Sequence, residues 1–167
     1  SDAIAGTSAS TYESETAQMQ IDYESDWNAL TGRSDSIPLF ESQMNTNSEG
    51  TIAVAQLDAH KNNSGKVILV GPKYQLGYYS DGLHLSSLGS KMLGELYAKV
   101  MKKVLVDGET WNPLMPLAVT NEANVVTIDY HIPEGTLAVD TTNVALRTNK
   151  GFEFYQTGGS SLSISSV

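Results

Sequence analysis

Three segments of the chain carry apolar side chains at the three- and four-residue spacing of an amphipathic helix. These segments are residues 8–31, 51–61 and 86–105. The spacing places the apolar side chains of each segment on one stripe, which we expect to face the core. In the first segment the stripe comprises Tyr12, Thr16, Met19, Tyr23, Trp27 and Leu30. Its acidic residues, Glu24 among them, lie mostly beside the stripe and are expected to face solvent.

Two short apolar runs between these segments predict buried strands. The first is Ile37 to Phe40, and the second is Lys66 to Val70, a β-branched run typical of a strand covered on both faces. Helices that alternate with strands in this order predict a parallel α/β sheet with crossover helices. Two strands are too few to cover three helices, since sheets usually contain about four to six strands. We therefore expect either unrecognised strands or, preferably, polypeptide outside this chain that completes the sheet.

The hydrophobic pattern changes near residue 108. Val126, Ile128, Tyr130 and Ile132 alternate with the residues between them, which predicts a half-buried strand. Further short strands are predicted at residues 137–139, 144–146, 152–154 and 160–167. The predicted organisation is an α/β domain over residues 1–108 and a small β-sandwich-like appendage over residues 109–167.

Composition narrows the classes of partner. The chain has 167 residues, a formal net charge of −9 and no cysteine. This negative charge argues against nucleic acid and against an anionic membrane surface as partners, because both bind clustered Lys and Arg. No apolar stretch approaches the ~20 residues of a membrane span. Without cysteine there is neither a disulfide framework nor a thiolate site.

The segment most suggestive of chemistry runs from Tyr78 to Gly89, after the second predicted strand and before the third helix. It therefore lies at the carboxyl edge of the predicted sheet, where open α/β folds bind ligands. Asp81 and His84 are three residues apart in a tight turn that Gly82 permits. At this spacing the carboxylate can accept a hydrogen bond from one imidazole nitrogen and leave the other free, which makes an oriented general base. The alternative is a capped helix start with a surface histidine.

The other two histidines carry less chemical information. His60 ends a predicted helix beside Lys61, so we expect it on the surface, and we expect His131 on the solvated face of its strand. No pair of histidines has the spacing of metal ligands, and no carboxylate cluster completes one. We therefore predict neither a metal nor a cofactor.

The sequence Asp81-Gly82-Leu83-His84, followed by Leu85-Ser86-Ser87-Leu88-Gly89 and a helix, resembles the last block of the SGNH (GDSL-type) esterase and lipase superfamily. Residues 31–44 and 70–74 are similar to its carbohydrate-acetylesterase-like branch, found in bacterial and phage-encoded proteins. Segments within residues 111–154 resemble the β-appendage of some of those proteins.

This resemblance implies the C-terminal portion of a three-layer, flavodoxin-like sheet and a serine esterase acting on O-acyl, specifically O-acetyl, esters of carbohydrates. It implies that His84 and Asp81 are the catalytic His and Asp, and that the substrate is an acylated carbohydrate. A secreted, cell-surface or virion-associated protein is expected rather than a cytoplasmic one. Gln43, at a strand end, and Tyr79, beside the Asp81 turn, are candidate substrate-binding residues, and structural roles are their alternative.

The sequence departs from the family pattern at the nucleophile, because it contains neither a Gly-Asp-Ser block nor the oxyanion-hole block. Ser36 follows a predicted helix and precedes a strand, the reverse of the order that a nucleophile elbow needs. Ser1-Asp2 is similar to the end of the family's third block, which makes Asp2 a further candidate substrate-binding residue. We expect an N-terminal segment or a second chain to supply the serine, and the isolated chain to be inactive. The alternative function is a non-catalytic carbohydrate- or partner-binding module of a phage tail or cell-surface protein.

Overall fold

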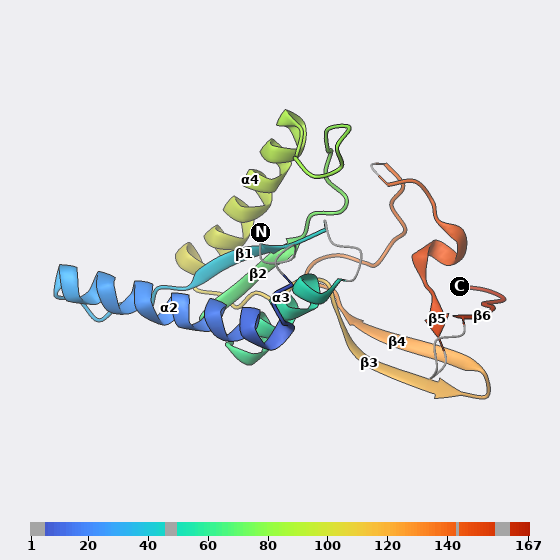
Figure 1. The fold of residues 1–167 in the computed structure, drawn as a ribbon, viewed down its shortest axis with the longest axis horizontal. Helices are drawn as coiled ribbons and strands as arrows, with labels where there is room; N and C mark the ends of the chain where they lie inside the picture. Colours follow the sequence, from blue (N-terminus) through green and yellow to red (C-terminus); the bar gives the residue numbers. More distant parts are fainter. Residues whose placement is uncertain (1–5, 46–49, 143, 156–160) are drawn as a thin grey trace. The chain divides into compact units, whose positions relative to one another are not determined.

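The structure is a computed structural model that describes residues 6–45, 50–142, 144–155 and 161–167 (Figure 1). The chain forms two compact units, Ser1–Gly135 and Thr136–Val167. The first unit contains α2 (Ala9–Thr31), β1 (Leu39–Gln43), α3 (Thr51–Asn62), β2 (Val67–Pro72), α4 (Ser87–Met101), the π-helical turn η1 (Lys102–Val106), β3 (Met115–Glu122) and β4 (Val125–His131). The fold is mixed α/β, with a small parallel sheet and small antiparallel pairs, so the predicted fold class is confirmed at this level. In the described residues, no helix is long and apolar enough to cross a membrane.

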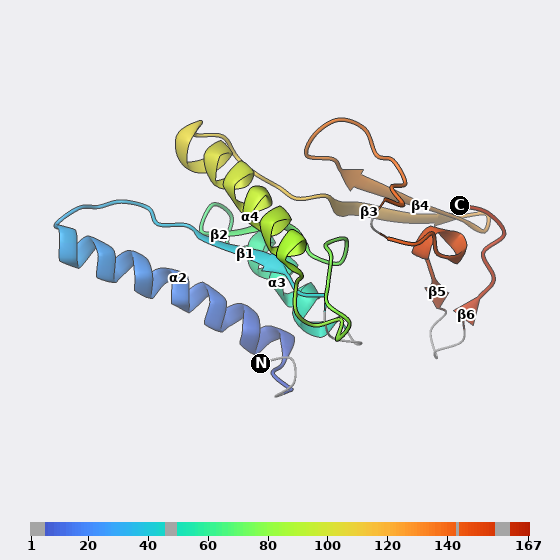
Figure 2. The same cartoon turned by 90° about the horizontal axis from the view of Figure 1, so that it is seen from above.

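The parallel sheet lies between helices on both of its faces. β1 and β2 pair in parallel, with Leu39 opposite Val67 and Glu41 opposite Leu69. Because side chains alternate along a strand, Ile68 and Val70 of β2 share one face, where they form the core with Val100 and other residues of α4. The buried α3 residues Ile52, Ala55 and Ala59 lie on the other side, where α2 and α3 contact each other and β2 (Figures 1 and 2).

The expectation that the apolar stripe of α2 faces the core is wrong over most of its length. Met19, Tyr23, Trp27 and Leu30 are exposed, with Leu30 at 85%, and the buried residues of the helix are Thr16 and Gln20. Only Thr16, and half-buried Tyr12, follow the prediction.

The buried face of α2 is polar because its side chains form hydrogen bonds with backbone groups of the extended segment before β1. Gln20 Nε2 donates to the carbonyl oxygen of Ile37 at 2.8 Å, and Glu24 accepts from the Ile37 N–H at 2.9 Å. Asn28 exchanges two hydrogen bonds with the backbone of Asp35, at 2.8 and 2.9 Å. Glu24 also forms an ion pair of 2.7 Å with Lys66, and its side chain is only 25% exposed, so it departs from the expected solvated face. The backbone groups of this segment have no strand partners and need hydrogen bonds, so the polar face of α2 packs against them.

Side chains cover the outer edge of β2. His60 Nδ1 lies 3.1 Å from the carbonyl oxygen of Val67, and the Leu69 N–H points to the same nitrogen at 3.4 Å. Trp111 Nε1 donates to the carbonyl oxygen of Leu69 at 3.0 Å, and His60 Nε2 lies 3.1 Å from Asn112 Oδ1. His60 is only 4% exposed, so the expectation of a surface histidine is wrong. Its imidazole contacts backbone groups of β2 that a neighbouring strand would otherwise pair with at this edge.

The C-terminal part of the first unit is the hairpin β3–β4, in which Val119 lies opposite Ile128 and Asn121 opposite Val126. The predicted strand around Val126–Ile132 is confirmed as β4, whereas the sequence analysis did not identify β3. Ala123 and Asn124 turn the chain with φ of 50° and 65°, as a two-residue hairpin turn requires.

The second unit contains η2 (Thr148–Gly151) and the short antiparallel pair β5 (Phe154–Tyr155) and β6 (Ser161–Leu162). The strands predicted at 137–139 and 144–146 are wrong, because neither segment is a strand. Those predicted at 152–154 and 160–167 correspond only in part to β5 and β6.

Candidate catalytic loop

The loop between β2 and α4 holds the predicted site at the carboxyl edge of the parallel sheet. β2 ends at Pro72 and α4 begins after Ser86, whose hydroxyl accepts from the Gly89 N–H at 3.1 Å. The loop closes on itself through two backbone hydrogen bonds of 2.9 Å, from Ser86 N–H to Gly77 C=O and from Tyr79 N–H to His84 C=O. The loop is thus a small hairpin that ends in a capped helix.

Two glycines make this closure possible. A Cβ on Gly89 would overlap the carbonyl oxygen of Gly77, and a Cβ on Gly77 would lie 2.9 Å from the Ser86 hydroxyl. Gly89, the glycine five residues after His84, is therefore required by the close approach of two backbone segments.

Asp81 is the centre of the loop's polar network. Its Oδ1 accepts hydrogen bonds from the backbone N–H groups of Leu83 and His84, at 2.9 and 3.0 Å. Its Oδ2 lies 2.9 Å from His84 Nδ1. Gly82 supplies the positive φ of 65° that lets the chain turn between the two side chains. The carboxylate–imidazole hydrogen bond predicted from the spacing is therefore present.

These hydrogen bonds also fix the charge of Asp81 and the tautomer of His84. The hydrogen bond to the His84 side chain, followed by those from the two backbone N–H groups, lowers the pKa of Asp81 from 3.8 to about 2. An ionised carboxylate can only accept hydrogen bonds, so the proton between the two groups resides on Nδ1. In the neutral ring Nε2 then carries a lone pair, which is the arrangement of a general base.

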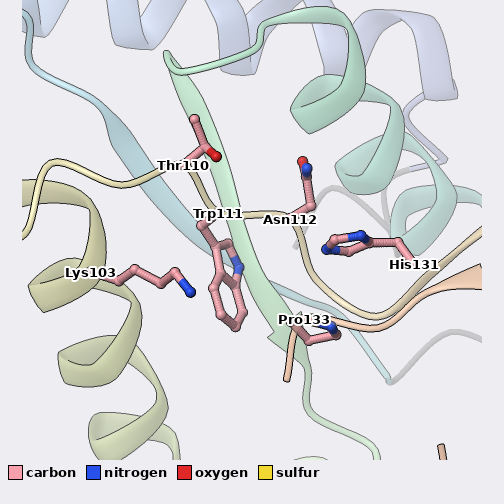
Figure 3. A pocket seen from close by; sticks show the side chains of 6 residues that line it. All are labelled: Lys103, Thr110, Trp111, Asn112, His131 and Pro133. Atoms are coloured by element: carbon pink, nitrogen blue, oxygen red, sulfur yellow. The ribbon is translucent and has the colours of Figure 1, made fainter. Parts of the chain in front are cut away.

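The pair is open to solvent. The side chains of His84 and Asp81 are 72% and 49% exposed. A small pocket of about 100 Å³ lies elsewhere, beyond the opposite end of α4, which as a helix of 15 residues is roughly 22 Å long. This pocket is lined by Lys103, Thr110, Trp111, Asn112, His131 and Pro133 (Figure 3). It is therefore not a cleft for the Asp81–His84 pair.

The remaining predicted substrate-binding residues differ in position. Gln43, at the carboxyl end of β1, donates through Nε2 to the carbonyl oxygen of Ala53 at 2.8 Å, which is the structural alternative considered for it. Tyr79 lies in the same loop as Asp81 and His84, and its side chain is 57% exposed. Asp2 lies outside the described residues.

Ser36 is far from His84 along the sheet. It precedes β1, at the amino edge, where its hydroxyl lies 3.1 Å from Lys66 Nζ. His84 follows β2, at the carboxyl edge of the same parallel sheet. The five residues of β1 alone separate the two edges by roughly 16 Å. Ser36 therefore cannot donate its proton to His84 in this fold.

Glu41 is a titratable group that the sequence analysis did not single out. Its half-buried side chain packs against α2 and α3, where Oε2 accepts from the Tyr12 hydroxyl at 3.4 Å and from Gln56 Nε2 at 3.3 Å. Its Oε1 is buried without a described partner. Burial raises the pKa of Glu41 from 4.5 to about 7. The available signal was an acidic residue directly after the apolar run Ile37 to Phe40.

Comparison of the chain with protein-family models, with curated proteins and with solved structures found no match. Among the described residues, no group of three or more His, Asp or Glu side chains is placed to hold a metal ion. The roles of His84, Asp81, Gln43 and Tyr79 in catalysis and binding stay predictions.

Proposed function

We propose that this chain is the C-terminal part of an SGNH-type serine esterase that hydrolyses O-acyl esters, specifically O-acetyl esters, of carbohydrates. The observation that carries the proposal is the 2.9 Å hydrogen bond between His84 Nδ1 and Asp81 Oδ2, in a loop at the carboxyl edge of a parallel sheet. A carboxylate-oriented imidazole with an accessible Nε2 is the acid–base half of an acyl-transfer triad. The ester and carbohydrate classes come from the sequence resemblance, because a fold alone does not specify a reaction.

In the proposed reaction, a serine hydroxyl from polypeptide outside this sequence attacks the carbonyl carbon of the ester. His84 Nε2 takes the hydroxyl proton as the new O–C bond forms, and gives it to the departing sugar oxygen as the ester bond breaks. A water molecule then attacks the acyl carbon and loses a proton to His84, which gives that proton to the serine oxygen as the acyl–serine bond breaks and the carboxylic acid leaves. Throughout, Asp81 holds Nδ1–H and stabilises the imidazolium that forms.

The open edge of β1 supports the idea that other polypeptide completes the site. In a parallel strand, every second residue directs its N–H and C=O groups to the strand on one side, and the residues between them direct theirs to the other side. The Leu39 N–H donates to Lys66 of the adjoining segment, so Phe40 and Ser42 face the opposite way. Gln56 Nε2 donates to the Ser42 carbonyl oxygen at 3.2 Å, but Phe40 has no described backbone partner. A strand added at this edge would extend the sheet toward the layered, flavodoxin-like architecture that the proposal requires.

The exposed stripe of α2 points to the same requirement. Met19, Tyr23, Trp27 and Leu30 recur at helical spacing and are 41%, 56%, 46% and 85% exposed. A contiguous apolar surface of this kind normally packs against another element. Polypeptide that joins the edge of β1 would give the helix more sheet to cover.

The proposal is tested by hydrolysis of an acetylated oligosaccharide and of p-nitrophenyl acetate. We expect no turnover by residues 1–167 alone, and turnover by a longer polypeptide in which the residues encoded upstream precede Ser1. In that longer polypeptide His84→Ala should lower kcat/KM at least about a thousandfold. His131→Ala, which removes a histidine from another element, is the matched control and should leave the rate unchanged.

Two results would contradict the proposal. One is turnover by residues 1–167 that is lost in Ser36→Ala, because it would place the nucleophile inside this chain. The other is a longer polypeptide whose hydrolysis is the same with and without His84.

A non-catalytic module that binds carbohydrate or a partner protein is the second candidate. The exposure of the His84 ring favours it, since the pocket beside Trp111 does not adjoin the loop. Glycan binding without hydrolysis by the longer polypeptide, unchanged in His84→Ala, would support the module and exclude the esterase.

A further inference from the structure

The pocket of about 100 Å³ beside Trp111, which we call the Trp111 pocket, is formed by three parts of the first unit (Figure 3). Lys103 comes from η1 at the end of α4, and Thr110 to Asn112 come from the segment before β3. Pro133 lies just after β4. Segments distant in the sequence thus converge on one small concave site, as they do in ligand pockets.

Two hydrogen bonds hold the walls of the Trp111 pocket in place. Trp111 Nε1 donates to the carbonyl oxygen of Leu69 at 3.0 Å, which fixes the indole against β2. Asn112 Oδ1 lies 3.1 Å from His60 Nε2, so the other amide atom of Asn112, Nδ2, is directed away from His60. No described residue accepts a hydrogen bond from this Nδ2, which leaves it as a donor for a ligand. Fixed walls lower the cost of ordering the site when a ligand binds.

The Trp111 pocket offers a positive charge, and no carboxylate of the described residues lines it. The Lys103 side chain extends toward the indole, with Nζ 5.9 Å from the centre of the ring (Figure 3). Glu109 lies 3.4 Å from Nζ, and the side chains of Lys103 and Glu109 are 26% and 60% exposed. A surface ion pair of this kind contributes little, so the ammonium can exchange Glu109 for a carboxylate of a ligand. An ammonium and an amide N–H are both donors to such an anion.

A second hollow, of about 280 Å³, shares Lys103 with the Trp111 pocket, and we call it the charged hollow. It is lined by Lys99, Lys102, Lys103, Asp107, Glu109 and Glu134. These side chains supply both donors and acceptors, which suit hydroxyl groups because a hydroxyl donates as well as accepts. A hydrocarbon ring would instead leave the charged groups that it covers without partners. The body of a ligand that extends from Lys103 into this hollow should therefore carry hydroxyls.

We propose that the Trp111 pocket and the charged hollow together bind a sugar acid. Its carboxylate accepts hydrogen bonds from Lys103 Nζ and Asn112 Nδ2, and the C–H groups beside the carboxylate pack on Trp111. Its hydroxyls face the charged hollow. The site is independent of the proposed esterase, because it lies beyond the opposite end of α4 from His84 and uses neither His84 nor Asp81.

Fluorescence gives a direct test, because the chain has two tryptophans and the other one, Trp27, lies on α2. In a Trp27→Phe chain the tryptophan fluorescence comes from Trp111. Titration with sodium glucuronate at constant ionic strength should change this fluorescence and saturate, with a Kd on the order of millimolar for so small a ligand. Glucose, which lacks the carboxylate, and benzoate, which lacks the hydroxyls, should each bind at least tenfold more weakly.

Lys103→Met, made in the Trp27→Phe chain, keeps most of the side-chain stem and removes the charge. It should weaken glucuronate binding at least tenfold and leave glucose binding unchanged, so that the preference for the acid disappears. Lys91→Met is the matched control, because it removes the same charge from an exposed ion pair of α4 with Glu95. It should leave the Kd for glucuronate within about twofold of its original value.

Asn112→Asp tests the other donor. It keeps an oxygen for the contact with His60 but replaces the amide N–H by a negative charge, so it should weaken glucuronate binding at least tenfold. A circular dichroism spectrum that matches the wild type establishes that each variant is folded.

Three results would overturn the proposal. The first is the absence of a saturable change with glucuronate. The second is glucose or benzoate that binds as tightly as glucuronate, because the site would then not require both the carboxylate and the hydroxyls. The third is a loss of glucuronate binding that is as large in Lys91→Met as in Lys103→Met.

Discussion

Replacing Glu41 by Gln should stabilise the first unit above neutral pH and have little effect below about pH 5. Glu41 lies among Tyr12, Gln56 and the α2–α3 packing, and its Oε1 has no described hydrogen-bond partner. Burial disfavours the ionised form and raises its pKa from 4.5 to about 7. Gln is nearly isosteric and stays neutral at every pH, so it removes only the ionisation.

The sign of the effect follows from proton binding. Between the unfolded pKa of 4.5 and the folded pKa of about 7, the folded chain binds more protons at Glu41 than the unfolded chain does. The free energy of unfolding therefore falls as the pH rises through this window. A pKa unit corresponds to about 1.4 kcal/mol, so the rise from 4.5 to about 7 corresponds to roughly 3 kcal/mol once the window has been passed.

Urea denaturation at pH 5 and at pH 8.5, followed by tryptophan fluorescence, measures this difference. Trp111 packs against the core of the first unit and reports its unfolding. Glu41→Gln should change the free energy of unfolding by less than about 1 kcal/mol at pH 5 and raise it by about 2 to 3 kcal/mol at pH 8.5. Glu15→Gln, at an exposed position of α2, is the control and should have the same small effect at both pH values.

The reasoning would be refuted by an equal effect of Glu41→Gln at the two pH values. A destabilising effect at pH 8.5 would refute it too, because it would mean that the carboxylate is the favoured form in the folded chain. Tyr12→Phe gives a further check on the same site. It removes a hydroxyl that donates to the carboxylate, so it should raise the folded pKa of Glu41 and with it the upper limit of the pH-dependent window.

Three further predictions concern the candidate loop and the edge of β2. Nitrogen NMR at pH 8 should show the proton of the His84 ring on Nδ1, and Asp81→Asn should mix the two imidazole tautomers. Asp81 should titrate near pH 2, so the contribution of its carboxylate to stability is present above about pH 4 and is lost as the pH falls through about 2. Gly89→Ala should destabilise the chain by more than about 2 kcal/mol in thermal unfolding, because its Cβ would overlap a backbone carbonyl. Trp111→Phe should lower the free energy of unfolding by about 1 to 3 kcal/mol, since it leaves a carbonyl of β2 without its donor; Trp27→Phe, at an exposed position, should change it by less than about 0.5 kcal/mol.

Local patterns predicted the elements of the α/β part, because each depends on residues close together in sequence. The run from Lys66 to Val70 and the helix spacing of residues 86–105 are such patterns, and the structure has β2 and α4 there. The Asp81–His84 hydrogen bond was predictable for the same reason, since three residues separate the two side chains.

Contacts between distant residues explain what the sequence did not reveal. The burial of His60 depends on Asn112, which is 52 residues away, and on the open edge of β2. Gln20 is buried because the Ile37 carbonyl oxygen needs a donor, a requirement that helix periodicity does not contain. In the second unit, short apolar runs such as residues 137–139 match the composition of strands but have no pairing partner among the described residues.

The same distinction bears on the division of the active site that the proposed function requires. Asp81 orients His84 with hydrogen bonds that arise entirely within one loop, and the loop is closed by Gly77, Ser86 and Gly89. Such a pair can be fully formed without the rest of an active site. A nucleophile and an oxyanion hole, in contrast, must reach this sheet edge from other strands, and Ser36 at the amino edge is too distant. Under the proposed function, an ordered His84 in residues 1–167 and an expected lack of turnover by the same residues are compatible, because the attacking serine would be carried by a strand that joins the open edge of β1.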